Sequence, residues 1–323
     1  MIKPNNKIIL IGTLPPPIGG VSIYNKRLYD FLSGREDFNT DFIDYKQNTI
    51  SAIVKEVMRH KIICLNCSSS RFKIFLAFVS WLLHKKFIVT FHGNMDRHSW
   101  IVNLLDKLIL KLATLSIVLN RQSFDYALKY SKKVFLGTAF IPPSVIEELS
   151  PEIKDLIISI RKKYKVICSS NAHNVSFDKF GNEIYQVRFL LEVFRQVENC
   201  CIILSDPSGM YSDYLKQNNV DIPKNVFVIK ITHSYFELLK EIDVMLRITT
   251  TDGDSISVRE ALYLKKIVIA SNIVDRPPGV VTVAISKEEL IENLKKVEMG
   301  MIHPVFEQVE NGGEQMLKIF ASL

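Results

Sequence analysis

Short apolar runs alternate with longer helix-like segments along almost the whole chain, and this alternation limits the fold more than any other feature. In the first half the apolar runs lie at residues 7–12, 40–44, 62–66, 87–91 and 115–119. Segments with helical length and periodicity lie between them, at residues 23–32, 49–59, 70–84 and 100–113. Strands that alternate with helices in this way form a parallel sheet with right-handed crossovers. The sequence therefore predicts an α/β fold.

The second half repeats the pattern after a break. Its predicted strands are residues 165–169, 200–205, 226–230, 244–248 and 267–270. Its predicted helices are residues 151–163, 184–196, 211–218 and 235–242. The break, residues 137–144 with the sequence GTAFIPPS, contains two prolines that cannot continue a helix or a central strand. We therefore predict one domain over residues 1–143, a second over 144–308, and a terminal segment, 309–323, that is helical from residue 313.

Composition places the chain among globular proteins. It has 323 residues, of which 47% are hydrophobic and 23% charged, which suits two core-forming domains. The longest apolar stretch, residues 74–83, is too short to span a bilayer, and the N-terminus leads directly into a strand rather than a signal peptide. The five cysteines are an odd number within apolar segments, which favours a reducing compartment. Cys64 and Cys67 have the spacing of a metal or redox pair, but no second Cys or His pair follows.

Positive charge is concentrated in the first half. Residues 1–150 have a net charge of +9 and the remainder −2. Such a surface suits an anionic membrane or a phosphorylated acceptor, and a merely solvated basic face remains an equal alternative. Nucleic acid fits the charge alone, because no zinc finger, ribonucleoprotein signature or helix-turn-helix pattern accompanies it. The candidate membrane contacts are Arg71, Phe72, Lys73, Phe75, Trp81, Lys85 and Lys86.

The most informative local stretch is residues 249–271, TTTDGDSISVREALYLKKIVIAS, which predicts a loop, a helix and a strand. Asp254 or Ser255 is a suitable N-cap, and Ser257 with Glu260 has the spacing of a capping box. The first N–H groups of a helix attract anions. Asp and Glu side chains beside these N–H groups can accept hydrogen bonds from hydroxyls. They therefore favour a phosphate that is attached to a hydroxyl-rich group. An ordinary capped helix is the alternative.

Asp252 and Glu260, with seven residues between them, resemble the Glu-x7-Glu motif of retaining nucleotide-sugar glycosyltransferases of family 4. The resemblance implies the GT-B fold, in which two Rossmann-like domains with parallel sheets face each other across a cleft. It also implies that Glu260 binds the ribose and that Asp252, one methylene shorter than the usual Glu, contacts the donor sugar. The amides between them would hold the pyrophosphate, along Gly253, Asp254, Ser255, Ile256 and Ser257. Residues 247–260 and 268–277 resemble the subgroup that builds bacterial surface polysaccharides such as O-antigen.

Loops at predicted strand ends supply further candidates, because ligands of parallel sheets bind beyond the carboxyl ends of the strands. Gly19 and Gly20 end the loop TLPPPIGG and would let the backbone approach a donor phosphate. His92 follows the strand at 87–91, and the resemblance implies that it contacts the donor sugar. The acceptor-side candidates next to it are Asn94, Asp96 and Arg97.

The second half offers candidates for the diphosphate. Asn171 lies in the small polar loop after the strand at 165–169, and Lys179 and Arg188 are candidates for the basic pair that the family usually has. Arg247 ends a strand and could meet the diphosphate or pair with Asp252 or Asp254. The segment Asp275–Arg276–Pro277 is expected to flank the nucleotide.

The resemblance implies that the protein is a retaining hexosyltransferase without cofactor or metal. Its donor would be a nucleotide sugar, a UDP-sugar rather than a GDP-sugar, and its acceptor a lipid-linked or growing glycan. We expect a cytoplasmic protein bound peripherally to the cytosolic face of the inner membrane. A GT-B sugar-nucleotide epimerase and a non-catalytic, glycosyltransferase-like binding subunit are the alternatives.

Overall fold

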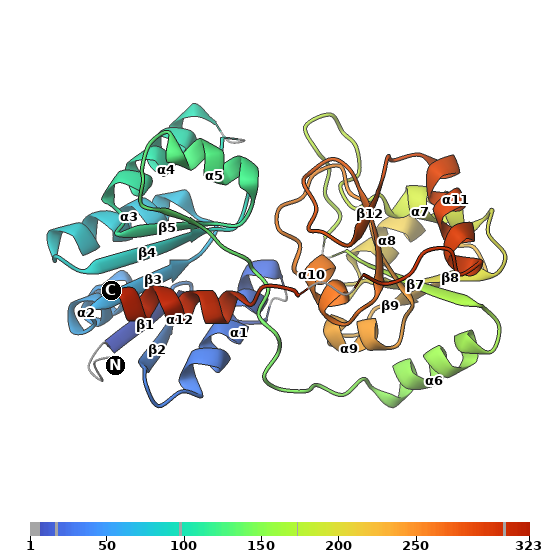
Figure 1. The fold of residues 1–323 in the computed structure, drawn as a ribbon, viewed down its shortest axis with the longest axis horizontal. Helices are drawn as coiled ribbons and strands as arrows, with labels where there is room; N and C mark the ends of the chain where they lie inside the picture. Colours follow the sequence, from blue (N-terminus) through green and yellow to red (C-terminus); the bar gives the residue numbers. More distant parts are fainter. Residues whose placement is uncertain (1–6, 17–18, 97–98, 173, 306–307) are drawn as a thin grey trace. The chain divides into compact units, whose positions relative to one another are not determined.

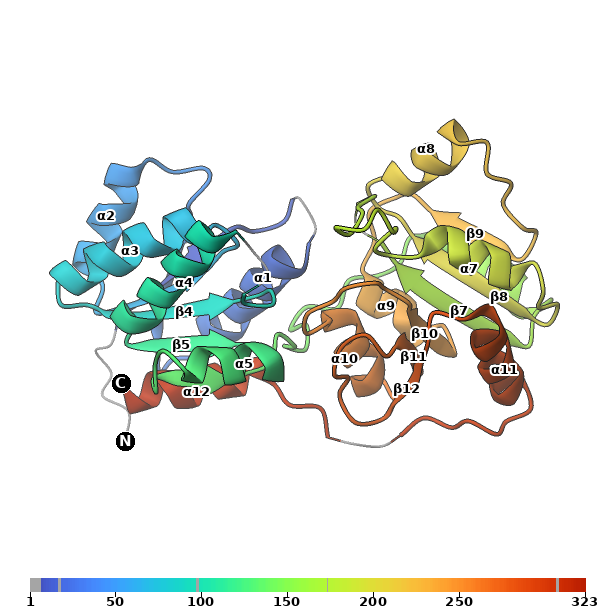
Figure 2. The ribbon, with the colours of Figure 1, turned by 90° about the horizontal axis from the view of Figure 1, so that it is seen from above.

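The computed structural model describes the chain except for residues 1–6, 17–18, 97–98, 173 and 306–307. The chain forms two compact units, and the C-terminal segment returns to the first of them (Figures 1 and 2). The first unit comprises residues 1–144 and 310–323, and the second comprises residues 145–309.

The first unit is built on a six-stranded parallel sheet with the order β2-β1-β3-β4-β5-β6. Its strands are β1 (Lys7–Gly12), β2 (Asn39–Asp44), β3 (Ile62–Asn66), β4 (Lys86–Phe91), β5 (Leu115–Val118) and β6 (Val134–Leu136). Its helices are α1 (Gly20–Ser33), α2 (Ile50–Arg59), α3 (Ser70–Leu82), α4 (Trp100–Leu112), α5 (Arg121–Leu128) and α12 (Gly312–Ser322).

Alternate side chains of the central strands enter different layers. Ile9 and Ile11 of β1 point into a core formed with α2, α3 and α4. The C-terminal helix α12 belongs to this unit, where Phe320 contacts Phe38 with 6.3 Å between ring centroids. A Cβ on Gly313 would lie 2.7 Å from the Phe31 ring, so only glycine allows this close packing of α12.

The second unit has a parallel sheet of the same size with the order β12-β11-β10-β7-β8-β9. Its strands are β7 (Val166–Asn171), β8 (Cys200–Ser205), β9 (Val226–Ile229), β10 (Val244–Arg247), β11 (Ile267–Ser271) and β12 (Val280–Val283). Its helices are α6 (Pro151–Arg161), α7 (Val187–Phe194), α8 (Met210–Gln217), α9 (Tyr235–Lys240), α10 (Ile256–Tyr263) and α11 (Lys287–Glu298).

The second sheet is covered on both faces. One face packs against α7, α8 and α11, and the other against α6, α9 and α10. A strand covered on both faces needs apolar side chains at successive positions, which is why these strands are continuous apolar runs. The predicted architecture of two Rossmann-like domains with parallel sheets is confirmed.

Four elements were not predicted: α5, β6, β12 and α11. The membrane contacts also need a correction, because Lys73 is buried and so cannot reach a lipid surface. Phe72 and Phe75 pack against the core of the first unit. Among the described residues, no helix is both long and apolar enough to cross a bilayer.

Candidate functional site

A cluster of charged side chains lies at the carboxyl ends of β10 and β11 in the second unit. Both oxygens of Asp252 accept from Arg247, at 3.0 Å each. One oxygen also accepts from Arg276 at 2.7 Å, and the other from the Gly253 amide at 3.0 Å. An ionised carboxylate has about four acceptor positions, so this set fills them. Asp252 therefore fixes two guanidinium groups side by side.

This cluster is buried and has a net positive charge. The side chains of Arg276, Asp252 and Arg247 are 2%, 7% and 11% exposed. Burial alone would raise the pKa of Asp252, but the charges of Arg247 and then Arg276 hold it below its ordinary value. Burial alone would lower the pKa of Arg247. The nearby Asp252 carboxylate more than offsets this effect, so the pKa of Arg247 is raised. Two cations and one anion remain, so the cluster is suited to bind an anion.

The helix α10 begins beside the cluster. Ser255 is its N-cap residue, but the Ser255 hydroxyl lies 3.1 Å from that of Ser257 rather than capping the backbone. The Ser257 hydroxyl donates to Asn171 Oδ1 at 3.1 Å, and Arg247 donates to the same oxygen at 3.4 Å. The predicted capping box of Ser257 and Glu260 is therefore wrong, because Ser257 lies inside the helix and bonds to β7 instead. The first N–H groups of α10 have no partner within a helix, and Arg247 is linked to this turn because it shares Asn171 Oδ1 with Ser257.

The other residues of the motif occupy the same loop and helix. Glu260 lies in α10, one turn after Ile256, and is 4% exposed. Asp254 pairs with Arg259 rather than with Arg247, so of the two pairings considered for Arg247 the structure contains the one with Asp252. Glu260 is close enough to Tyr235 to act on it electrostatically.

Lys179 and Arg188 do not join this cluster. Both side chains are exposed, and Lys179 lies over the Phe180 ring, 5.0 Å from its centroid. The basic pair that the structure brings together is Arg247 and Arg276. The sequence contained a signal for Arg276, since it follows β11, but did not show that it would reach Asp252.

The first unit contains His92 at the end of β4. Its ring packs edge-on against Tyr24, with 5.1 Å between centroids. Burial, and then the positive charge of Lys73, lower the pKa of His92 to about 3, so the imidazole is neutral at pH 7. Its Nε2 is buried and has no hydrogen-bond partner among the described residues.

The remaining first-unit candidates lie near α1 and α4. Gly19 is the N-cap of α1, and a Cβ on Gly20 would meet no described atom within 4 Å, so the backbone there has open space. Asn94 accepts from Asn120 at 2.9 Å and exposed Asp96 from Asn103 at 3.2 Å. Arg97 lies outside the described residues.

Residues that the sequence analysis did not single out include Tyr185, whose ring lies 5.2 Å from the Arg247 guanidinium. The five cysteines are buried free thiols. In the part of the chain that the structure describes, no three His, Cys, Asp or Glu side chains are grouped so that they could hold a metal.

Solved structures with the same architecture are numerous. HepE from Anabaena, in complex with UDP and glucose, is 12% identical and has a TM-score of 0.74, with 99% of this chain and 100% of that chain covered. The fold is GT-B. The chain matches no protein-family model and no curated protein sequence.

Two further similar structures are those of a UDP-GlcNAc 2-epimerase and of MnaA. The UDP-GlcNAc 2-epimerase from Methanocaldococcus jannaschii is 14% identical, with a TM-score of 0.64 and coverage of 98% of this chain and 100% of that one. MnaA from S. aureus, solved with UDP, is 12% identical, with a TM-score of 0.62 and coverage of 97% and 95%. At these identities the likeness concerns the fold alone.

Proposed function

We propose that this protein is a retaining glycosyltransferase that transfers a sugar from a UDP-sugar to a lipid-linked glycan during the synthesis of a bacterial surface polysaccharide. The observation that carries the proposal is the net-positive cluster of Arg247, Asp252 and Arg276 at the start of α10. Glu260 follows in the same helix and is buried, at 4% exposure.

This arrangement matches the chemistry of a nucleoside diphosphate. The two guanidiniums and the N-terminal amides of α10 would bind the phosphates, since Arg is well suited to phosphate oxygens. Glu260 would accept hydrogen bonds from the ribose hydroxyls. Because Asp252 already holds both arginines in place, little side-chain ordering remains when the donor binds.

The same groups would assist the reaction. As the bond between the sugar and the diphosphate breaks, negative charge develops on the leaving phosphate oxygens, and the prearranged cations stabilise that charge. The leaving phosphate would take the proton of the acceptor hydroxyl on the same face of the sugar, which retains the configuration. Neutral His92 would hydrogen-bond to the donor sugar, a role that comes from the family resemblance.

The fold similarity to UDP-GlcNAc 2-epimerases supports a second candidate, a sugar-nucleotide epimerase. The two activities consume the donor differently. A transferase releases UDP and needs an acceptor for fast turnover, whereas an epimerase yields an isomeric sugar without a glycan acceptor.

Incubation with a panel of UDP- and GDP-sugars, with and without a lipid-linked glycan fraction, tests both candidates. UDP release that depends on the glycan supports the transferase, and the anomeric configuration of the product tests retention. Formation of an isomeric sugar without the glycan would establish the epimerase instead. Binding of a nucleotide sugar without either reaction would indicate a non-catalytic binding subunit.

A surface on α3 and α4 supports the lipid-linked acceptor. Seven apolar side chains are exposed there: Phe78, Trp81 and Leu82 from α3, and Trp100, Ile101, Leu104 and Leu108 from α4. We call these residues the α3–α4 surface. Among basic residues on the same two helices, Arg71 and Lys111 are exposed. Exposed aromatic side chains next to cations are typical of a surface that binds anionic lipid.

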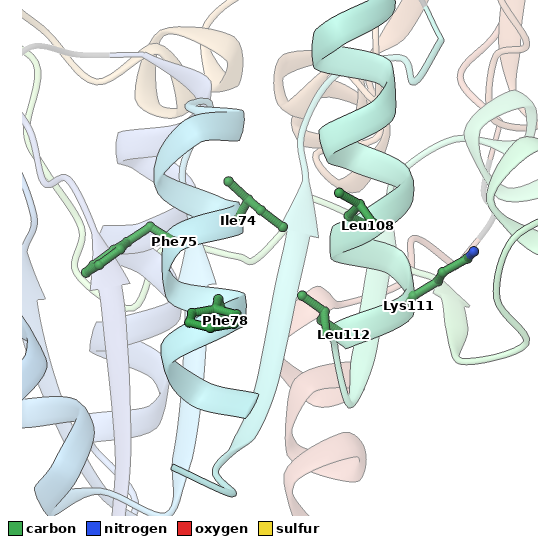
Figure 3. Close-up of a pocket in the computed structure, with 6 residues that line it drawn as sticks. All are labelled: Ile74, Phe75, Phe78, Leu108, Lys111 and Leu112. Carbon is green, nitrogen blue, oxygen red and sulfur yellow. The ribbon is translucent and has the colours of Figure 1, made fainter. Parts of the chain in front are cut away.

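A groove of about 540 Å³ runs along the same surface (Figure 3). Ile74, Phe75 and Phe78 project from α3 on one side, and Leu108 and Leu112 from α4 on the other (Figure 3). Lys111 also lines the groove, and its ammonium group points away from α3 (Figure 3), where it would meet lipid phosphates.

Co-sedimentation with vesicles tests this surface. We expect binding to anionic vesicles, to which each basic residue contributes on the order of 1 kcal/mol. Because salt screens these charges, the binding should fall as the salt concentration rises. Trp100→Ala should weaken binding, and Phe180→Ala is the matched control, since both side chains are about equally exposed, at 75% and 77%. Binding that ignores lipid charge and salt, or equal effects of the two variants, would contradict membrane docking by the α3–α4 surface.

A further inference from the structure

A buried lysine lies at the carboxyl edge of the first sheet. Lys73 is in the first turn of α3, and the residue is only 4% exposed. Its ammonium group lies 4.4 Å from the centroid of the Phe91 ring, at the end of β4. Burial lowers the pKa of Lys73, and the nearby Cys67 and Asp106 only partly oppose this. The fold therefore keeps a cation in an environment that disfavours charge.

Within the described ranges of the chain, no carboxylate forms an ion pair with Lys73 Nζ. Asp106 accepts from the Ser70 hydroxyl at 2.9 Å, and it attracts Lys73 electrostatically without forming an ion pair with it. Buried charges in folded proteins are normally paired, because an unpaired one loses its hydration without compensation. A buried lysine without an acidic partner therefore calls for another explanation.

The position of Lys73 at the carboxyl edge of the sheet supplies an explanation for its burial. Its charge acts on Cys67 and His92, which follow β3 and β4, and ligands of parallel sheets bind at this edge. His92 Nε2 is a buried polar atom that has no hydrogen-bond partner among the described residues. The start of α3 adds the positive end of a helix dipole. Three features at one place thus favour a negatively charged ligand.

We infer that Lys73 binds a phosphate group of the acceptor substrate. This assignment to the acceptor rests on the proposed function, whereas the phosphate site itself does not. The bound phosphate would replace the missing carboxylate partner of Lys73 and would lie next to His92. Lys73 would thereby hold the acceptor by its charged part, near the histidine proposed to contact the donor sugar.

The site is tested with the full chain and inorganic phosphate, followed by the NMR signals of the His92 imidazole. Phosphate that binds Lys73 should shift these signals in a saturable way and raise the pKa of His92, because the cation beside it becomes neutralised. Lys73→Met should weaken this binding roughly 10- to 100-fold, as expected for the loss of one charge-assisted hydrogen bond. Lys73→Arg should retain it. Lys55→Met, at an exposed lysine of α2, is the matched control and should leave it unchanged.

Stability provides a second readout that separates binding from structure. If the charge of Lys73 serves a ligand, Lys73→Met should be at least as stable as the wild type, because it removes an unpaired buried charge. The same variant should raise the pKa of His92 without phosphate. Marked destabilisation by Lys73→Met, or phosphate shifts at His92 that survive this substitution, would overturn the proposal.

The source of the phosphate can be identified in the same assay with geranyl phosphate. Tighter binding of geranyl phosphate than of inorganic phosphate would support a lipid-linked acceptor, and equal binding would support a free or sugar-bound phosphate. Neither measurement requires UDP-sugar turnover. Failure of the phosphate site and failure of the proposed transferase activity are therefore distinguishable.

Discussion

Replacing Asp252 by asparagine should reveal what this carboxylate does. The substitution keeps the size of the side chain and removes its charge, so Arg247 and Arg276 lose the anion that both contact. Breaking a buried ion pair by removing one partner costs about 3–5 kcal/mol, because the remaining charge is uncompensated. Here two guanidiniums would be left, and Arg276 is almost fully buried. We expect a loss of stability in this range for the second unit.

The loss should be fully present at neutral pH. The pKa of Asp252 in the folded protein lies below its ordinary value of 3.8, so the carboxylate stabilises the fold above that pH. This contribution disappears only as the pH falls below about 4, through the folded pKa. For a unit of 150 to 250 residues, 1 kcal/mol corresponds to roughly 2–4 °C, so the melting temperature should fall by roughly 6–20 °C.

Thermal unfolding with and without UDP is the assay. The diphosphate would supply the missing negative charge, so UDP should raise the melting temperature of Asp252→Asn by more than it raises that of the wild type. Asp254→Asn is the control, because Asp254 pairs with Arg259 outside the cluster. Normal stability of Asp252→Asn, combined with weaker binding of UDP-sugar but not of UDP, would refute this reasoning and favour a direct sugar contact.

Two other predictions concern single side chains. Glu260→Ala should lose roughly 2–4 kcal/mol of donor binding free energy, because it removes charged hydrogen bonds to the ribose. Calorimetry with UDP measures this loss, and a folded variant with unchanged affinity would exclude the ribose role. His92 should make the first unit less stable as the pH falls from 6.5 towards 3, since the unfolded chain takes up a proton that the folded one does not. His92→Asn should flatten this part of the stability profile in chemical denaturation, and an unchanged slope would mean that the ring is hydrated in solution.

The fold could be predicted from the sequence because its central strands are buried on both faces. Residues 8–11 and 62–65 are at most 1% exposed, and such strands consist of uninterrupted apolar residues. The missed strands β6 and β12 lie at sheet edges, are short and are mostly half-buried, so their apolar runs are weak. Helix α11 is rich in Lys and Glu, and only one stripe of it is buried.

The site was predictable only where its residues are close in the sequence. Asp252, Ser257 and Glu260 lie in one loop and helix, so a short motif places them together. Asn171 contacts Ser257 across 86 residues, and Arg276 contacts Asp252 across 24. Both contacts depend on β10 lying between β7 and β11, a strand order that local patterns do not contain. The burial of Lys73 was missed for a related reason, since its environment comes from β3, β4 and α4.

The aspartate at position 252 suits a site in which the arginines are held by the protein itself. The Glu-x7-Glu motif that this segment resembles has a glutamate here, and its extra methylene would carry the carboxylate away from the two guanidiniums. The shorter side chain instead accepts hydrogen bonds from Arg247, Arg276 and the Gly253 amide. A carboxylate with these partners has little capacity left for a sugar hydroxyl, but it keeps two cations in a fixed geometry, which would suit the proposed diphosphate. Discrimination between donor sugars would then depend on other side chains, and nucleotide binding on this cluster.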